Sequence, residues 1–396
     1  MRESLSLKMR QIESMHSMMN VSCLSVAFFL VFDIICLGVN TFINSYISQT
    51  PLDSAVLYGV LFLGILISIF REQKINCRLL LLLISILLVF FISLLFNIEN
   101  LQYITLQNVY YIFIGMVMAV ILSNIRCFDK IIDELYFMVP FAILCGLIHL
   151  TCERGSNDSK WVSDMNSAYA MLVPVLFSIE LSFRKKWMWL FAIFGTLITC
   201  LYGSRGPILI IAIYLAFSII KHAKSISSKI VVAAAGILIL YFLLSGSYLG
   251  ALQQLDKYLS SKNIVLASLN KILYYNDKSN GRVDVYSQAF AMISENPFWG
   301  CGIFGDRIFA AYSHNLFVEL LLDFGIPLGF FFVCFIIVNA VKIIVVARKK
   351  LGEDGFVFVV IIFLAVYGQL MVSSSYLQCP LFFASMGLFY ARRRMQ

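Results

Sequence analysis

The apolar stretch LLLLLISILLVFFISLLF, residues 79–96, decides the fold class of this chain. It carries no charge, and its length is close to the ~20 apolar residues that an α-helix needs to cross a bilayer. Inside a bilayer every backbone N–H and C=O must be paired within the protein, so only helices and closed barrels cross it. A barrel strand alternates apolar and polar residues. This stretch has no such alternation and therefore predicts a membrane-spanning helix.

Similar apolar segments occur along the whole chain. Of its 396 residues, 61% are hydrophobic and 13% are charged, and the mean hydropathy is +0.88. We therefore expect an all-α polytopic integral membrane protein with about twelve transmembrane helices, folded as a single membrane-embedded domain over residues 1–396. The expected spans are residues 20–39, 54–70, 79–96, 104–122, 131–150, 166–182, 187–202, 206–220, 230–249, 315–345, 356–372 and 378–391.

The basic residues predict the orientation of these spans. Lys and Arg are enriched in cytoplasmic loops, and one arrangement of the spans places 21 of the 30 Lys and Arg inside. In that arrangement both termini are cytoplasmic. The loops 40–53, 97–103 and 373–377, which carry no basic residue, then face out. The bias accounts for the net charge of +8, so this charge does not predict a nucleic-acid partner.

The longest exported segment is the loop 250–313, in which apolar residues recur at helical spacing. Such stripes predict short amphipathic helices that lie on the membrane face. A turn at 277–281 precedes the second stripe, and Pro297 is expected to end the helix that carries it. The stripes are formed by Leu252, Leu255 and Leu259 and by Tyr286, Ala289, Phe290 and Ile293.

A histidine stands where the long loop meets the span 315–345. An ionisable group beside a membrane helix is a functional candidate by default, although a lone histidine at a helix start more often only satisfies the helix end. Ser313 can serve as the N-cap with help from Asn315, so capping does not require the imidazole of His314. An ordinary pKa near ~6.5 suits His314 to remove a proton from a hydroxyl group. We expect Glu319, about one turn further on, to orient it.

Three arginines are expected on the same side. Arg205 lies in Gly-Ser-Arg-Gly-Pro, residues 203–207, which is typical of a tight turn. Its side chain either reaches to the membrane surface or offers a planar fork to a diphosphate. Arg282 opens the second amphipathic helix, where backbone N–H groups favour anions, although an arginine on a surface helix is more often solvated. Arg307 is a further basic candidate with no local motif.

Two short matches to known motifs are rejected. Residues 300–305, Gly-Cys-Gly-Ile-Phe-Gly, have the spacing of a dinucleotide-binding fingerprint, but no strand–helix–strand unit surrounds them. Residues 323–325, Asp-Phe-Gly, lie in a membrane span without any other kinase element. The chain has no Cys-x-x-Cys and no His-Glu-x-x-His, so we expect neither a metal nor another cofactor.

In this order, the motifs resemble those of the bacterial O-antigen ligase and O-antigen polymerase family. The ordered set comprises Ser204–Gly206, Gly281-Arg282 at a helix start, Asn296–Gly302, and Ser313–Asn315 followed by Glu319, Gly325 and Gly329. It covers residues 200–330, and the layout of the spans is similar over the whole chain. The resemblance implies a metal-independent membrane glycosyltransferase whose donor is a glycan carried by undecaprenyl diphosphate.

The resemblance also implies roles for the site residues. Arg205 and Arg282 would neutralise the diphosphate leaving group, and His314 would activate the acceptor hydroxyl. The loop 151–165 is shorter than the second large exported loop of some polymerases of the family, which puts a two-loop relay of substrate in doubt. The candidate substrate-binding residues are Ser204, Asp284, Arg307, Asn315 and Glu319.

Within the family we favour a polymerase that joins undecaprenyl-diphosphate-linked repeat units of O-antigen, capsule or exopolysaccharide on the outer face of the bacterial cytoplasmic (inner) membrane. The alternative enzyme is a ligase that transfers lipid-linked glycan to the lipid A core of lipopolysaccharide. The non-enzyme alternative is a flippase or transporter, for which inverted repeats or paired broken helices are typical, and the sequence shows neither. The expected partners are the lipid-linked donor and acceptor, membrane lipids, a chain-length regulator and a flippase for lipid-linked glycan.

Overall fold

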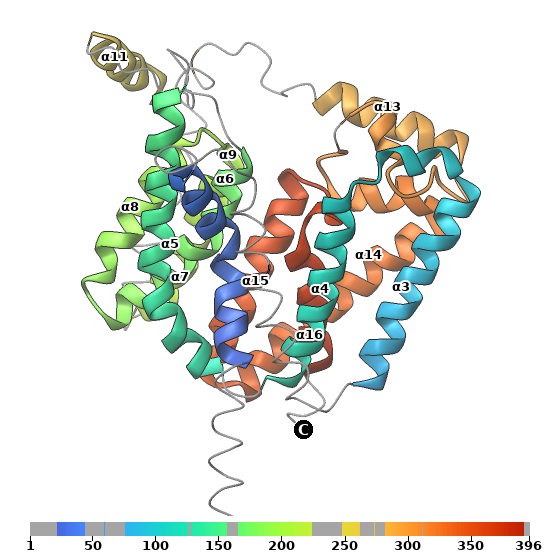
Figure 1. Ribbon diagram of the computed structural model, residues 1–396, viewed down its shortest axis with the longest axis horizontal. Coiled ribbons are helices and arrows are strands. Elements are labelled where there is room, and N and C mark those ends of the chain that lie inside the picture. Colours follow the sequence, from blue (N-terminus) through green and yellow to red (C-terminus); the bar gives the residue numbers. More distant parts are fainter. Residues whose placement is uncertain are drawn as a thin grey trace, which may run out of the picture. The chain divides into compact units, whose positions relative to one another are not determined.

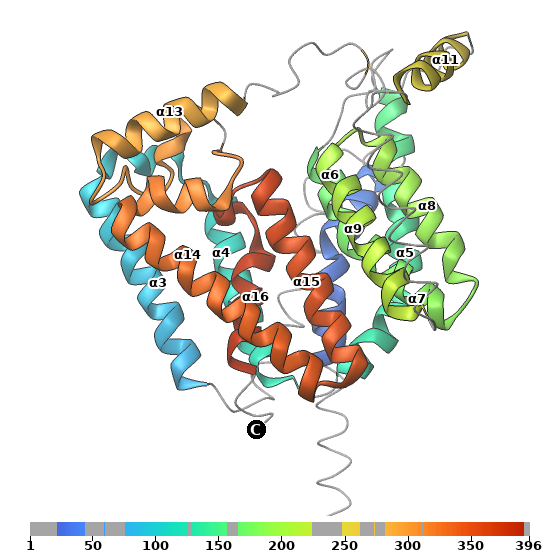
Figure 2. The same ribbon diagram turned by 180° about the vertical axis from the view of Figure 1, so that it is seen from behind.

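The computed structural model describes residues 22–43, 59, 76–125, 128–156, 165–223, 248–261, 273, 282–310 and 312–391. These residues form α-helices and short 3-10 helices, and none of them is in a strand (Figures 1 and 2). The all-α fold class is therefore confirmed.

Within this described part of the chain, eight helices are long and apolar enough to cross a membrane, and two shorter helices are also apolar. These ten helices match ten of the twelve expected spans, which confirms a polytopic membrane protein. The other two expected spans, 54–70 and 230–249, lie almost entirely outside the described residues. The long helices are Ser22–Ile43, α3 (Cys77–Phe96), α4 (Leu106–Asn124), α5 (Phe128–Ser156), α6 with α7 (Met165–Ala170 and Leu172–Arg184), α9 (Arg205–His222), α14 (Leu316–Lys350) and α15 (Gly352–Val372), and the shorter ones are α8 (Met188–Leu201) and α16 (Pro380–Ala391).

Helix α3 illustrates why these segments belong in a membrane. One of its faces, which includes Leu79, Ile86 and Phe90, is buried against the protein. The opposite face is equally apolar but exposed, with Leu81 and Phe91 each 62% accessible. A helix that is apolar all round is stable beside lipid, where it has no unpaired backbone groups and no contact with water.

Two further helices lie in the long loop 250–313, α11 (Tyr248–Ser260) and α13 (Arg282–Glu295). Both coincide with the expected amphipathic stripes, and α13 ends two residues before Pro297, as expected. Ala289 and Ile293 are buried, whereas Phe290, from the same expected stripe, is exposed. The buried face of α13 is therefore narrower than the apolar stripe. The expected turn at 277–281 lies outside the described residues.

The chain divides into two compact units. The first comprises Met1–Phe28, Gly59–Glu134 and Ser279–Gln396, and the second comprises Phe29–Tyr58 and Leu135–Lys278. Helices α3, α4 and α13–α16 thus belong to the first unit, and α6–α9 and α11 belong to the second. The single membrane domain expected over residues 1–396 stays a prediction.

In the first unit, α4 and α16 approach each other closely at glycines. A Cβ atom on Gly115 would collide with the backbone of Pro380, and one on Gly387 would collide with the backbone of Ala119. Small residues at such crossings let membrane helices pack through backbone contact, where apolar side chains alone gain little from leaving lipid.

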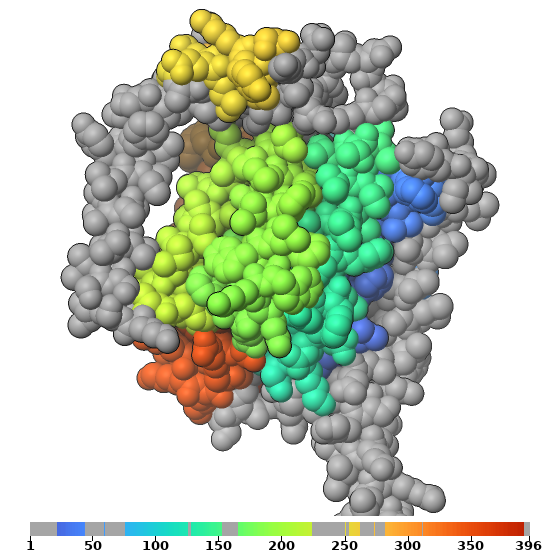
Figure 3. Space-filling view, turned by 90° about the vertical axis from the view of Figure 1, so that its left-hand side faces the viewer, coloured from blue at the N-terminus to red at the C-terminus, as the bar shows by residue number. Residues whose placement is uncertain are grey.

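In the second unit, whose helices α5 and α7–α9 face the viewer in Figure 3, a buried carboxylate ties α7 to α9. Glu180 accepts hydrogen bonds from Tyr214 (2.8 Å), Ser218 (2.9 Å) and Lys221 (2.7 Å), which lie on one face of α9. A buried carboxylate requires such partners because its desolvation is otherwise too unfavourable. These bonds fix the register of α9, whose first residue is Arg205.

Candidate functional site

The site is built around a break in α14. The helix spans Leu316–Lys350, but Gly325 has a non-helical backbone (φ 74°, ψ 173°) and Pro327 follows it. The break divides α14 into a first segment, residues 316–324, and the longer span that follows. The expected span 315–345 is thus matched by a helix that is broken at Gly325. Figure 2 shows the first segment below α13 and the longer span descending from it.

A break inside a membrane protein leaves backbone groups that must be paired. Here the loop 297–302 pairs them. The N–H of Cys301 donates to the carbonyl of Leu322 (2.7 Å), and the N–H of Gly302 donates to that of Asp323 (3.0 Å). Across the break, the N–H of Ile326 donates to the carbonyl of Pro297 (2.7 Å). The loop and the broken helix thus form one rigid support.

This pairing explains the glycines that imitate a dinucleotide-binding fingerprint. Gly300 and Gly302 have positive φ (71° and 78°), and a Cβ atom on Gly300 would collide with the backbone of Leu322 and Gly325. Glycine is required where the backbone is left-handed and another backbone approaches closely. The motif therefore serves close packing of a loop against a broken helix.

Side chains hold the same support from two sides. Asn100, in the 3-10 helix η1 (Ile98–Tyr103), donates to the carbonyls of Cys301 (2.9 Å) and Ile303 (3.1 Å). From the other side, α13 packs its buried Ala289 and Ile293 against Leu322 of the first α14 segment. The position of this segment is thus fixed by α13, by the loop 297–302 and by η1.

His314 lies directly before this fixed segment and has an unusual backbone, with φ at +59°. Its ring packs edge-on against Tyr312, with 4.4 Å between ring centroids. Its Nδ1 atom is buried and has no hydrogen-bond partner among the described residues. Burial, and then the charge of Arg282, lower the pKa of His314 below its ordinary value near 6.5. The neutral imidazole is therefore the dominant form at neutral pH.

His149, a buried histidine in the second unit, differs from the half-buried His314 in this respect. His149, in the second unit, has Nδ1 2.7 Å from the hydroxyl of Thr41 and Nε2 2.9 Å from that of Ser167. Both of its nitrogens are satisfied, as is usual for a buried polar side chain. The unpartnered nitrogen is thus a specific feature of His314.

Two details expected around His314 are wrong. The N-cap of α14 is Asn315 and not Ser313. The side chain of Asn315 accepts from the N–H groups of Phe317 (2.9 Å) and Val318 (3.3 Å). Glu319 does not orient His314. Its carboxylate is completely buried and accepts from the hydroxyl of Ser375 and the N–H of Tyr376 (3.4 Å).

The partners of Glu319 come from a segment that the sequence analysis treated only as a short exported loop. Residues 373–379 connect α15 to α16 and include the 3-10 helix η3 (Tyr376–Gln378). The hydroxyl of Tyr376 also donates to the buried Asp323 (2.7 Å). The run Ser-Ser-Ser-Tyr at 373–376 was the available signal, because its hydroxyl groups can donate hydrogen bonds to carboxylates.

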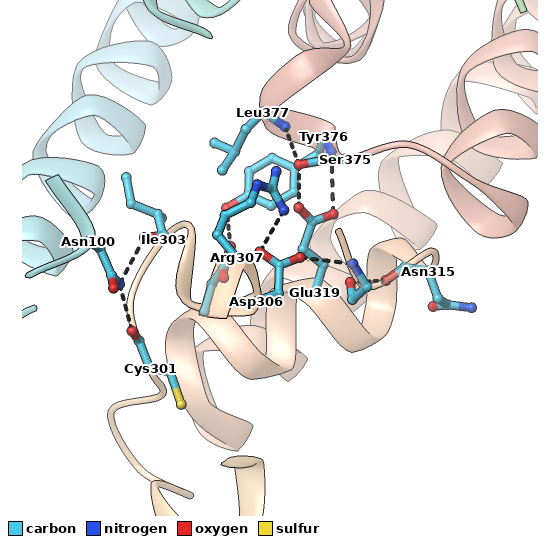
Figure 4. Close-up of polar contacts among 12 residues, drawn as sticks. Asn100, Cys301, Ile303, Asp306, Arg307, Asn315, Glu319, Ser375, Tyr376 and Leu377 are labelled. Carbon is cyan, nitrogen blue, oxygen red and sulfur yellow. Dashed lines mark hydrogen bonds and ion pairs between the residues drawn. The ribbon is translucent and has the colours of Figure 1, made fainter. Parts of the chain in front are cut away.

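An ion pair lies beside these acids, in the 3-10 helix η2 (Gly305–Ile308) (Figure 4). Arg307 donates to Asp306 (2.7 Å) and lies over the ring of Phe304. The second oxygen of Asp306 accepts from the N–H of Ser313 (2.8 Å). Burial raises the pKa of Asp306. Arg307, a candidate for substrate binding, is thus already paired inside the protein, and Asp306 is a site residue that the sequence analysis missed.

Arg282 is the first residue of α13 and is partly buried. None of the described carboxylates forms an ion pair with it, and it lies close enough to His314 for its charge to affect the imidazole. Asp284, two residues further along α13, is exposed. Gly281, which precedes Arg282, lies outside the described residues. Arg282 and His314 thus belong to the same unit.

Arg205 and Ser204 lie in the second unit. As expected, a tight turn separates α8 from α9, and Gly203 in this turn has φ at +77°. Arg205 is the exposed first residue of α9. Of the three residues expected to act together, Arg282 and His314 thus share one unit and Arg205 belongs to the other.

Comparison with known protein families identifies one matching segment. Residues 189–333 match the family described as O-antigen ligase. The segment includes Arg205, Arg282 and His314, and the match confirms the resemblance that their motifs indicated. A comparison with curated proteins found no match. The match to residues 189–333 supports the O-antigen ligase and polymerase family, and the long apolar helices show a membrane protein.

Proposed function

From the match to the O-antigen ligase family, we propose that the protein is a metal-independent glycosyltransferase that polymerises undecaprenyl-diphosphate-linked repeat units of O-antigen, capsule or exopolysaccharide. In this proposal it acts at the outer face of the bacterial inner membrane, with both termini in the cytoplasm. The alternative is a ligase that transfers finished glycan to the lipid A core, in keeping with the description of the family.

One observation carries the proposal. His314 is half-buried, has an unpartnered Nδ1 and lies near Arg282, which favours its neutral form. A neutral imidazole can accept a proton, and the guanidinium of Arg282 can stabilise an anion. This pair supplies the two functions that transfer from a glycosyl diphosphate requires.

In the proposed reaction, His314 takes the proton from an acceptor hydroxyl as the hydroxyl oxygen attacks the anomeric carbon of the donor. The bond between that carbon and the phosphate oxygen breaks, and the diphosphate leaves with the bonding electrons. Arg282 and Arg205 offset its negative charge, and protonated His314 returns its proton to water. The donor already contains the required free energy, because a diphosphate is a good leaving group.

The proposal is tested with purified protein in liposomes that contain lipid-linked repeat units, with or without lipid A core. A polymerase is expected to produce a ladder of longer chains on the lipid carrier, independently of lipid A core. A ligase is expected to label lipid A core and leave the lipid-linked chains at their original length. If neither product forms, the proposed glycosyl transfer is wrong.

Replacing Arg205 by lysine is expected to reduce glycan output almost as much as replacing it by alanine, by about 10²–10³-fold. A lysine is a point charge and cannot make the two parallel hydrogen bonds by which a guanidinium binds a phosphate. Gel analysis of the ladder measures the effect. Arg348→Lys, in the last turn of α14, is the control. Full glycan output from Arg205→Lys would mean that Arg205 is an ordinary surface charge without a specific role in transfer.

The pH dependence follows from the state of His314. Neutral imidazole is the active form, and both burial and Arg282 favour it. The rate is therefore expected to be constant near neutral pH and to fall as the pH drops through a value below about 6.5. Measuring kcat/KM against pH gives this value for the free enzyme. A decline that begins above pH ~7 would contradict the assignment.

A further inference from the structure

The backbone of His314 is strained. Its φ of +59° lies in the left-handed region, which residues other than glycine rarely adopt. Such a conformation is unfavourable and persists only where neighbouring contacts enforce it. The contacts on both sides of His314 therefore determine where its imidazole lies.

On the C-terminal side, Asn315 caps α14 and fixes the chain that follows. On the N-terminal side, the N–H of Ser313 donates to Asp306 (2.8 Å). Both residues are buried, with Ser313 at 0% and Asp306 at 1% exposure. A hydrogen bond from a backbone N–H to a buried carboxylate is stronger than one between neutral groups. Asp306 thus holds the residue directly before His314.

Asp306 is itself held firmly. Its other oxygen accepts from Arg307 (2.7 Å), and its backbone lies in η2, next to the loop that pairs with the α14 break. The two other buried acids of this region do not compete for Ser313, because Glu319 is bonded to Ser375 and Tyr376 and Asp323 is bonded to Tyr376.

We propose that Asp306 is a positioning residue for transfer: it holds His314, through the backbone of Ser313, in its left-handed conformation. This inference rests on the proposed function of His314 as the base. It assigns Asp306 no contact with substrate. Its effect is transmitted through the backbone of Ser313.

The test compares Asp306→Asn with Asp306→Leu in the full-length protein, with kcat and KM measured on lipid-linked repeat units. Asparagine keeps an oxygen that can accept from Ser313, whereas leucine has a similar size and no acceptor. We expect kcat to fall by about tenfold for asparagine and about 100-fold for leucine, since small misplacements of a catalytic group have effects of this size. KM for the donor should change less than threefold. Glu295→Gln, at the exposed end of α13, is the control.

The pH profile separates positioning from a simple effect of charge. The charged and titratable groups in this region lie on several elements. They are Arg282 of α13, Asp306 and Arg307 of η2, Tyr312 of the loop before α14, Glu319 and Asp323 of α14, and Tyr376 of η3. If Asp306 acted only through its charge, its removal would disfavour the imidazolium and move the acidic limb of kcat/KM to lower pH. If it positions His314, the released imidazole becomes less buried and lies further from Arg282. The limb then moves to higher pH.

Asp306→Asn therefore gives a result in either direction, even if Asp306→Leu does not fold. A lower kcat with the acidic limb moved to higher pH supports the proposal. An unchanged kcat, or a limb that stays in place or moves to lower pH, overturns it. His314→Gln, measured in parallel, distinguishes failure of the proposed base from failure of the positioning role. If His314→Gln is fully active, the assignment of His314 as the base is wrong. If His314→Gln is inactive and Asp306→Asn is unaffected, only the positioning role of Asp306 is refuted.

Discussion

Replacing His314 by glutamine is expected to slow glycosyl transfer by about 10²–10⁴-fold while donor binding stays nearly unchanged. Glutamine is similar in size and forms hydrogen bonds, but it cannot accept a proton at neutral pH. Cells with this variant should accumulate single lipid-linked repeat units in place of a ladder of long chains. Single-turnover transfer with preformed donor complex measures the chemical step, and titration with labelled donor measures binding.

His149→Gln is the matched control, because His149 is a buried histidine with hydrogen bonds at both nitrogens. Its replacement should lower the melting temperature and leave the turnover of folded protein close to that of the wild type. A normal ladder at normal rate from His314→Gln would assign the base elsewhere. Asp284 would be tested next, because it is exposed on α13, whereas Glu319 is fully buried and already bonded.

The fold class could be predicted because it depends on local properties. An apolar run such as that of α3 needs a bilayer whatever its neighbours are, and ten of the expected spans have a matching helix. The break in α14 could not be predicted in the same way. Gly325 and Pro327 are compatible with a break, but the groups that pair with it belong to the loop 297–302, and only the folded chain shows that the loop lies there.

The site was predicted in part. His314 was identified by its place at the end of the loop, and it belongs to the same unit as Arg282. Glu319 was assigned to His314 by helical spacing, an argument that holds only if both residues belong to one helix. His314 is outside α14 and has a left-handed backbone, so spacing along the helix does not place its side chain. Asp306 was missed because it acts on Ser313, seven residues further along, through a turn that no local pattern indicates.

Replacing Gly300 by alanine is expected to destabilise the protein strongly, because Gly300 lies in the loop that packs against the break in α14. The left-handed backbone at φ +71° costs a non-glycine residue about 1–2 kcal/mol. The added Cβ would also meet the backbone of Leu322 and Gly325, and overpacking adds about 1–3 kcal/mol. The sum, roughly 2–5 kcal/mol, is a large part of the stability of an ordinary protein. Thermal denaturation in detergent and the amount of folded protein in membranes measure the effect.

Two other glycines separate the two contributions. Gly352 has nearly the same backbone, with φ at +68°, but open space around the added Cβ, so Gly352→Ala should show the conformational part alone, about 1–2 kcal/mol. Gly250, within α11, has open space and no positive φ, so Gly250→Ala should stabilise the helix slightly, by about 0.5–1 kcal/mol. The expected order of stability is Gly250→Ala, Gly352→Ala, Gly300→Ala. If Gly300→Ala is no worse than Gly352→Ala, the loop has room to move away from α14, and its close packing is not what keeps the broken helix and His314 in place.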